Sequence, residues 1–300
     1  MIYLREFTIP PKKVDELVFT PSKPKNPYFI PETNIPAYNN HYPFIIFRNR
    51  IVKPVEFSNI TIFCGDNGSG KSTILNLIAE KLEINRSSAF NRSSFFDDYL
   101  KLCSYDMSSN FSSNILSNSK VITSDDVFDF LLNLRYANEG IDVKREELLS
   151  EYVESKNKDF KFSSLDDYEE MKKVVDSKRQ SASKYVKDRT MKNIIGRSNG
   201  ESAYMYFTEN IRESGIYILD EPENSLSVKN QIKLVKYIED SARFYNCQFI
   251  IATHSPFVLS LKEAKVYDLD STPMVESKWT EIENVKLYYK FFKDREEEFK

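Results

Sequence analysis

The chain has 300 residues, enough for one large α/β domain with an insertion or for about two average domains. Its 42 basic and 45 acidic residues give a formal net charge of −3, which excludes a global field that attracts nucleic acid or anionic membranes. No apolar run approaches the length of a membrane span, roughly 18 residues, and the first residues carry no secretory signal, so we expect a cytoplasmic protein without membrane insertion.

The first 58 residues contain short β-like runs among many prolines, at 3–9 and 44–48. Proline in sheets is confined to edges, bulges and strand starts. These runs therefore predict an antiparallel edge sheet ahead of the next strand.

Residues 59–64 are β-branched and apolar, which predicts a buried strand. Residues 65–73 match G-x-x-x-x-G-K-[ST] without a mismatch, in a chain with only seven glycines. Apolar residues at helical spacing follow, so backbone N–H groups would converge on a phosphate at the positive end of a helix dipole. Lys71 would contact the β- and γ-phosphates, and Ser72 would ligate Mg²⁺. The predicted ATP-binding residues here are Gly65, Asn67, Gly68, Ser69, Gly70, Lys71, Ser72 and Thr73.

The composition of the middle of the chain changes at residue 85 and again at residue 120. Residues 85–119 are rich in serine and asparagine, which predicts loops with short helices. Residues 120–123 predict a strand, and the helical, charged pattern beyond them predicts an inserted helical lobe.

This lobe contains a basic stretch, with nine basic residues against two acidic ones between 172 and 197. It is a candidate surface for a phosphate backbone or an acidic partner, and a solvated helix face is the alternative. The nine are Lys172, Lys173, Lys178, Arg179, Lys184, Lys187, Arg189, Lys192 and Arg197.

Two further apolar strands end in polar residues. Residues 216–219 lead into Asp220 and Glu221, and a proline then ends the strand. Ligands bind at the carboxyl ends of parallel strands, so we predict that Asp220 holds Mg²⁺ and Glu221 polarises the attacking water, with a solvated acidic turn as the alternative. Residues 248–252 lead toward His254, which would contact the γ-phosphate or that water. The predicted catalytic residues are Lys71, Glu221 and His254.

Residues 198–202, Ser-Asn-Gly-Glu-Ser, open a predicted helix with Ala203, Phe207 and Ile211 on one face. This segment resembles the signature motif of ABC-type ATPases, in the Ser-x-Gly-Glu-Ser form of non-transporter members. Together with the P-loop, the Asp-Glu pair and His254, it makes the chain similar to small stand-alone ABC-type ATPases with an AAA-type domain, related to SMC and recombination-repair heads.

The resemblance implies ATP and Mg²⁺ as cofactors and a head-to-tail homodimer that forms with ATP. Asp220 would be the magnesium carboxylate, Glu221 the catalytic base and His254 the switch histidine.

The same resemblance implies a contact between subunits. Ser198, Gly200 and Glu201 of one subunit would contact the γ-phosphate held by Lys71 of the other, since a helix N-terminus favours anions. Residues 225–227 would cross the dimer seam.

One family feature is missing, because no glutamine occurs before Gln180. ABC-type ATPases usually carry a glutamine at a strand end between the P-loop and the signature. Asp125 is the candidate replacement, and capping of the following helix by Ser-Asp-Asp is the alternative. The family also implies an aromatic ring that stacks on adenine, for which the candidates are Tyr42, Phe44 and Phe47.

The expected fold class is α/β: a P-loop NTPase of ABC-type head form, with a mixed sheet core, an N-terminal antiparallel β subdomain and an inserted helical lobe. The expected domains are 1–123, 124–197 and 198–300. We expect a non-transporter ATPase that hydrolyses ATP and acts on an unidentified partner protein or nucleic-acid complex, in DNA repair or phage defence. The alternatives are the nucleotide-binding subunit of a membrane ABC transporter and a module that binds ATP without turnover.

Overall fold

The computed structural model describes residues 1–11, 42–44, 46–47, 51, 53–159, 161, 167–192 and 199–300. The chain forms two compact units, Met1–Val127 with Ala203–Lys300, and Phe128–Ser202. Our domain boundaries at 124 and 197 stay a prediction. Within the described ranges, no helix has both the length and the apolar content that crossing a membrane requires.

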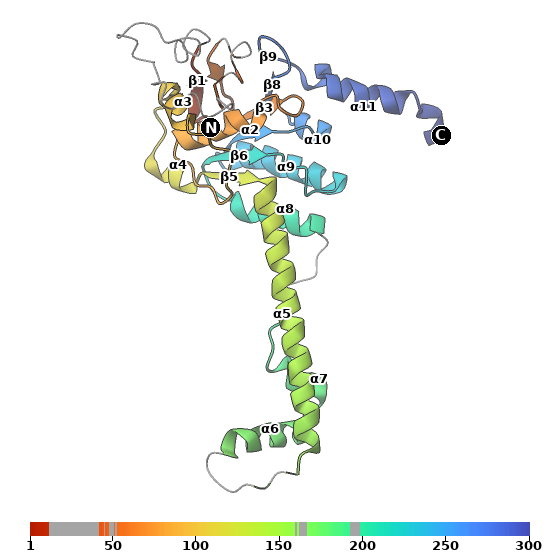
Figure 1. Cartoon of the computed structure of the whole chain (residues 1–300). Helices are drawn as coiled ribbons and strands as arrows, with labels where there is room; N and C mark the ends of the chain where they lie inside the picture. Colours follow the sequence, from red (N-terminus) through yellow and green to blue (C-terminus); the bar gives the residue numbers. More distant parts are fainter. Residues whose placement is uncertain are drawn as a thin grey trace. The chain divides into compact units, whose positions relative to one another are not determined.

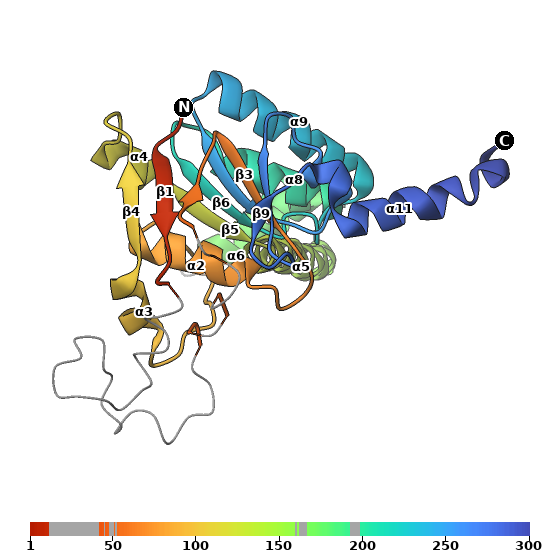
Figure 2. The same cartoon turned by 90° about the horizontal axis from the view of Figure 1, so that it is seen from above.

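A six-stranded sheet forms the core of the first unit (Figures 1 and 2). In sheet order its strands are β5 (Lys120–Thr123), β6 (Ile216–Asp220), β7 (Gln248–Ala252), β3 (Ile60–Cys64), β8 (Lys265–Asp268) and β9 (Val275–Glu276). All neighbouring strands are parallel except β9, which runs antiparallel to β8. Every residue of β3 and β7 is buried, as expected for parallel strands covered on both faces. The predicted α/β fold with a mixed sheet is confirmed.

Two helices pack on this sheet, one on each face (Figure 2). α2 (Lys71–Lys81) begins directly after the glycine-rich turn. α9 (Val228–Phe244) buries Leu234, Ile238 and Ala242, which share one helix face because they are four residues apart.

Residues 199–202 of the predicted signature segment open α8 (Asn199–Asn210), and the predicted apolar face of Ala203, Phe207 and Ile211 is fully buried. The other helices among the described residues of the first unit are α3 (Phe96–Leu102), α4 (Ser113–Asn118), α10 (Pro256–Leu259) and α11 (Glu283–Lys293), with 3-10 turns at Trp279–Glu281 and Glu296–Phe299.

A second sheet is antiparallel and contains the N-terminal strand. Its order is β2 (Val55–Glu56), β1 (Leu4–Thr8) and β4 (Ser104–Met107). The buried side chain of Gln248 joins the two sheets: its Oε1 accepts from the backbone N–H groups of Tyr3 and Leu4, and its Nε2 donates to the carbonyls of Leu4 and Ser58. Three of these bonds are buried and the one to Ser58 is partly buried, so an unpaired amide here would be costly.

Two local predictions in this region are wrong. Within the predicted strand 44–48, the described residues Phe44, Ile46 and Phe47 form turns. Residues 104–107, predicted to be loop, form β4 instead. β4 is an edge strand with exposed side chains, so its pairing with β1 leaves no apolar alternation to detect.

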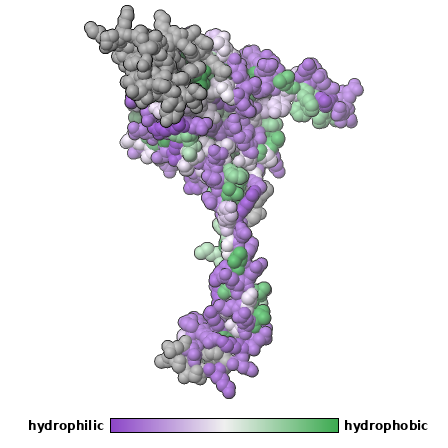
Figure 3. All heavy atoms as spheres, viewed as in Figure 1, coloured by the Kyte–Doolittle hydropathy of each residue, from purple (hydrophilic) through white to green (hydrophobic). Residues whose placement is uncertain are grey.

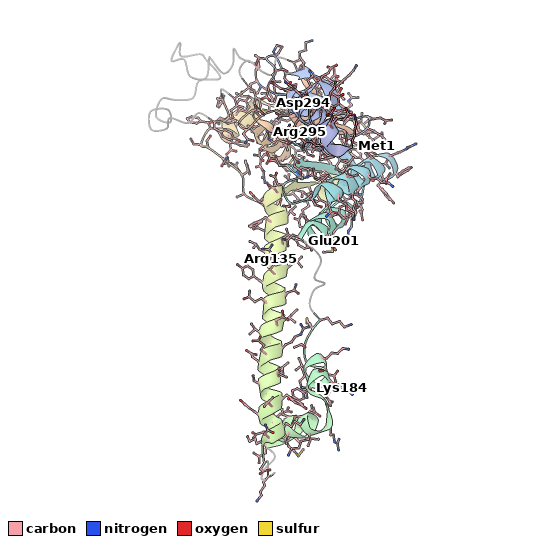
Figure 4. All side chains as sticks on the ribbon, turned by 90° about the vertical axis from the view of Figure 1, so that its right-hand side faces the viewer. Met1, Arg135, Lys184, Glu201, Asp294 and Arg295 are labelled. Atoms are coloured by element: carbon pink, nitrogen blue, oxygen red, sulfur yellow. The ribbon has the colours of Figure 1, made fainter. Side chains whose placement is uncertain are left out.

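The second unit is helical. Its elements are α5 (Ser124–Asn157), which starts in the first unit, α6 (Tyr168–Arg179) and α7 (Ala182–Lys187). At 1.5 Å per residue, the 34 residues of α5 extend over about 51 Å. α7, which carries the labelled Lys184, lies beside α5 (Figure 4). Leu148, Tyr152 and Tyr185 form the small core between them.

Candidate active site

The predicted polar residues follow strands that end at one edge of the six-stranded sheet. The P-loop follows β3, Glu221 follows β6 and His254 lies two residues beyond β7. The register pairs Phe63 with Ala252 and Ala252 with Asp220, so these three strand ends lie side by side. A parallel sheet collects side chains in this way because all its strands point in one direction.

Glycine is required at two P-loop positions. Gly70 has φ +102°, and a Cβ there would lie 2.8 Å from side-chain atoms of Ile46 and Phe47. Gly65 has φ +145°, and a Cβ there would lie 2.8 Å from the Ser69 hydroxyl. The backbone therefore takes a path that residues with side chains would disturb, and it delivers its N–H groups to the start of α2.

Lys71 lies at the first position of α2 and is only 4% exposed. Its Nζ donates to the carbonyls of Gly65 and Asp66, at 2.9 and 3.2 Å. Burial lowers the pKa of Lys71, and the nearby carboxylates of Glu221 and Asp220 oppose that shift. The lysine thus lies within its own P-loop, near the two carboxylates predicted to act with it.

Ser72 and Asp220 meet across the sheet edge, where the Ser72 hydroxyl donates to Asp220 Oδ1 at 3.2 Å. Burial raises the pKa of Asp220 to about 6, and the bond from Ser72 opposes that rise. Both residues line a cavity of about 340 Å³. A hydroxyl and a buried carboxylate at a P-loop are oxygen donors of the kind Mg²⁺ prefers, so these residues fit the predicted metal.

Asp125 and Arg86 line the same cavity as Ser72 and Asp220. The helix-capping role belongs instead to Asp126, whose Oδ2 accepts from the Thr123 backbone at 2.8 Å while its own N–H donates to Thr123 Oγ1 at 3.3 Å. This reciprocal pair is a capping box. The two adjacent aspartates therefore lie in different surroundings, and Asp125 is the one at the cavity.

Glu221 and His254 face each other, with His254 Nε2 at 3.4 Å from Glu221 Oε1. Glu221 has φ +49°, a strained conformation for a residue with a side chain. Its N–H donates to Ala252 O at 2.9 Å, which holds this conformation against β7. With Asp66, Asn67 and Asn224, these two residues line a polar cavity of about 640 Å³.

Comparison with known proteins identifies the family. A family model described as ABC transporter matches residues 54–224, more than half of the chain. The chain belongs to the ABC-type ATPases. A second model, described as an AAA ATPase domain, matches residues 191–259. The two models make this chain an ATP-binding protein with the general chemistry of ATP hydrolysis.

Solved structures similar to this ABC-type ATPase are distant. The Smc head domain of Pyrococcus furiosus with an extended coiled coil, bound to the C-terminal domain of ScpA, is 14% identical with a TM-score of 0.42, and the match covers 99% of this chain and 100% of that one. The SMC head domain of Thermotoga maritima is 14% identical with a TM-score of 0.39, over 77% and 95%. A protein described as a metal-chelate type ABC transporter is 16% identical with a TM-score of 0.36, over 77% and 76%. A search of curated proteins found no match.

Three residues of this candidate site were missed by sequence reasoning. Asp270, after β8, accepts from the backbone N–H of Asp66 at 2.7 Å and so holds the start of the P-loop. Glu223 accepts a hydrogen bond from the backbone of the His254 loop, and Asn224 donates one to Glu221. Glu223 and Asn224 stand close to the predicted motif, but nothing in the local pattern separates them from ordinary turn residues.

Three further predicted residues belong to the predicted signature segment. Ser198 lies outside the described residues, and Gly200 and Glu201 belong to the first turn of α8 within Phe128–Ser202. Figure 4 labels Glu201 at the start of that helix. Their predicted role in a second subunit stays a prediction.

Two of the three adenine-stacking candidates are wrong. Phe44 and Phe47 are buried in the core of the first unit, so neither ring is open to a ligand. Tyr42 is half-buried and stacks on Phe96 at a centroid distance of 6.2 Å.

A larger cavity of about 930 Å³ lies beside the candidate site, between His254 and α11. Its walls are mostly apolar and aromatic, including Trp279, Tyr288 and Phe292. Figure 3 shows apolar surface on α11, where Leu287 and Phe292 are more than half exposed. This groove is larger, but residues predicted to bind phosphate and Mg²⁺ line the smaller polar cavities.

Proposed function

We propose that this ABC-type ATPase hydrolyses ATP as a non-transporter member, and that ATP joins two copies that act on a partner protein or a nucleic-acid complex. The observation that carries the proposal is the convergence of Lys71, the Ser72–Asp220 pair and the Glu221–His254 pair at one sheet edge. A binding module without turnover would need no base and histidine within contact distance of each other.

Each residue has a chemical task in this proposal. Lys71 and the N–H groups of the P-loop neutralise the phosphates. Glu221 accepts a proton from the attacking water, and His254 orients the water and the γ-phosphate. Mg²⁺, when held by Ser72 and Asp220, neutralises charge that develops on the phosphate oxygens.

We also propose Asp125 as the replacement for the absent glutamine, supported by its position in the cavity of Ser72 and Asp220. Asp125→Ala should raise the Mg²⁺ concentration needed for half-maximal turnover. Asp129→Ala, one turn further along the exposed face of α5, is the matched control. Equal Mg²⁺ dependence in both variants would reject the assignment.

For the dimer, Ser198, Gly200 and Glu201 of one copy are proposed to contact the phosphates held by Lys71 of the other. The position of Gly200 and Glu201 in the first turn of α8 supports this, because the positive end of a helix dipole favours anions. DNA repair and phage defence are the processes proposed for the assembly, and a membrane transporter is the alternative.

The decisive variant is Glu221→Gln, with Glu239→Gln on α9 as the control. We expect Glu221→Gln to bind ATP normally but to turn it over at least ~10²-fold more slowly, which is the scale of general-base catalysis. Light scattering of Glu221→Gln with ATP should show a dimer, and proteins captured with this trapped form should include the partner. Absence of hydrolysis by the unmodified protein would reject the enzyme, and a persistent monomer would reject the shared site.

A further inference from the structure

We propose that Glu223 and Asn224 are positioning residues for the reaction: Glu223 fixes the loop that carries His254, and Asn224 fixes the carboxylate of Glu221. This inference rests on the proposed ATPase function. In this proposal, the turn after β6 supplies the base Glu221 and also the two residues that hold the base and the histidine loop in place.

Glu223 binds the His254 loop through a single oxygen. Its Oε1 accepts from the Thr253 hydroxyl at 2.8 Å, from the His254 N–H at 2.7 Å and from the Ser255 N–H at 3.1 Å. Hydrogen bonds to a carboxylate are stronger than neutral ones, and these three span consecutive residues around the histidine. Displacing the carboxylate would therefore release the loop at three points.

The second oxygen of Glu223 argues against a purely structural role. Glu223 Oε2 is buried and has no hydrogen-bond partner among the described residues. A buried carboxyl oxygen without a hydrogen-bond partner lowers stability, so a residue chosen only for stability would avoid it. The presence of this unpaired oxygen next to Glu221 and His254 therefore favours a functional role for Glu223.

Asn224 acts on the base directly. Its Nδ2 donates to Glu221 Oε2 at 2.8 Å, while His254 Nε2 lies 3.4 Å from Glu221 Oε1. Each carboxylate oxygen of Glu221 therefore faces one neighbour, and the hydrogen bond from Asn224 restricts rotation of the group. The Asn224 N–H also donates to the Glu221 carbonyl at 3.2 Å, so the same residue closes the turn in which Glu221 has its positive φ.

The contacts of Glu223 and Asn224 act on the same pair of residues, Glu221 and His254. Glu223 holds His254, His254 faces Glu221, and Glu221 is held from the other side by Asn224. General-base catalysis depends on geometry at the scale of 1 Å, so loosening either contact should slow the reaction without weakening binding at the P-loop.

The kinetic experiment compares Glu223→Ala, Glu223→Gln and Asn224→Ala with two matched controls. Glu239→Gln changes a carboxylate that accepts one backbone N–H from Lys262 away from the site. Asn118→Ala removes an Asn-to-Glu bond like that of Asn224, but to Glu213. We expect kcat to fall about 10- to 100-fold in Glu223→Ala and Asn224→Ala, with the Kd for ATP within about 2-fold of the unmodified protein. Glu223→Gln keeps an acceptor oxygen and should recover most of the rate.

A second readout does not depend on turnover. The chain has two histidines, so the imidazole NMR spectrum holds two side-chain signals, and a His41→Gln variant assigns them. Glu223→Ala should shift the His254 signal, whereas Glu239→Gln should leave it unchanged. An unmoved His254 signal, or losses in Kd that match those in kcat, would overturn the proposal. A complete lack of hydrolysis by the unmodified protein would instead count against the proposed function, and the NMR result would then decide the positioning contacts alone.

Discussion

The sheet edge of the first unit and the small core of Phe128–Ser202 are built in different ways. At the sheet edge, buried strands fix where each loop begins, and polar side chains from distant parts of the sequence meet there. In the second unit a few side chains, centred on Tyr185, hold α7 against a long helix whose residues are mostly exposed or half-buried. Buried parallel strands thus bring polar side chains together in one place, and their chemistry indicates a function. The exposed surface of the long helix gives no such indication of what it binds.

The largest effect should come from Lys71→Ala, which removes the charge at the centre of the P-loop. We expect no measurable ATP binding by calorimetry, because the N–H groups alone would face the triphosphate without a cation. Lys81→Ala, at the other end of α2, is the control. Normal ATP affinity in Lys71→Ala would show that the sheet edge is not the nucleotide site.

Tyr185→Ala tests the second unit. The ring is fully buried, and Arg189 covers it at 3.9 Å, so its removal should cost about 3 kcal/mol or more in the free energy of unfolding of this unit. Hydrogen exchange should increase in α6 and α7 while ATP affinity stays the same. Tyr136→Ala, at an exposed position of α5, is the control. A parallel loss of ATP binding would show that the two units depend on each other.

Asp220→Asn should separate function from stability at the sheet edge. The pKa of Asp220 is raised from 3.8 to about 6 in the folded protein, so folding is favoured while the carboxyl is protonated, and this advantage is lost as the pH rises through about 6. Without Mg²⁺, the variant should gain roughly 3 kcal/mol in free energy of unfolding at pH 8 and less than about 1 kcal/mol at pH 4. Urea titrations at both values, with the exposed Asp240→Asn as control, measure this. A pH-independent difference would contradict it.

The smallest effect concerns the basic stretch. Lys173 and Arg189 form ion pairs with Glu151 and Asp176, so only part of the predicted positive charge is free for a ligand. Lys184 and Lys187 are exposed and are therefore the residues to change. Changing both to Glu should weaken nucleic-acid binding several-fold and reduce its salt dependence by about two counterions.

The control for this test is the double change of Lys229 and Lys236 to Glu on α9, which alters charge by the same amount in the first unit. Binding that falls equally in both double variants, or no binding by the unmodified protein, would favour the solvated-helix interpretation.

Much of the fold was predictable because its signals are local. The P-loop strand and helix, the strands before Asp220 and His254, and the apolar face of α8 all follow from periodicity over fewer than about 15 residues. β4 was missed because its partner is β1, about 100 residues away, and its exposed side chains carry no alternation. The stacking candidates Phe44 and Phe47 were misjudged because nothing local distinguishes a buried ring from an open one.

The sequence by itself determined that the chain is a P-loop ATPase, because a glycine-rich turn between a buried strand and a helix is specified by adjacent residues. Only the tertiary structure decided which neighbours support the chemistry. Asp270 reaches the P-loop, and Glu223 reaches the His254 loop, through hydrogen bonds between residues 204 and 31 positions apart. Such bonds depend on which strands lie together in the sheet, and strand order is set by burial of the whole core rather than by any short segment.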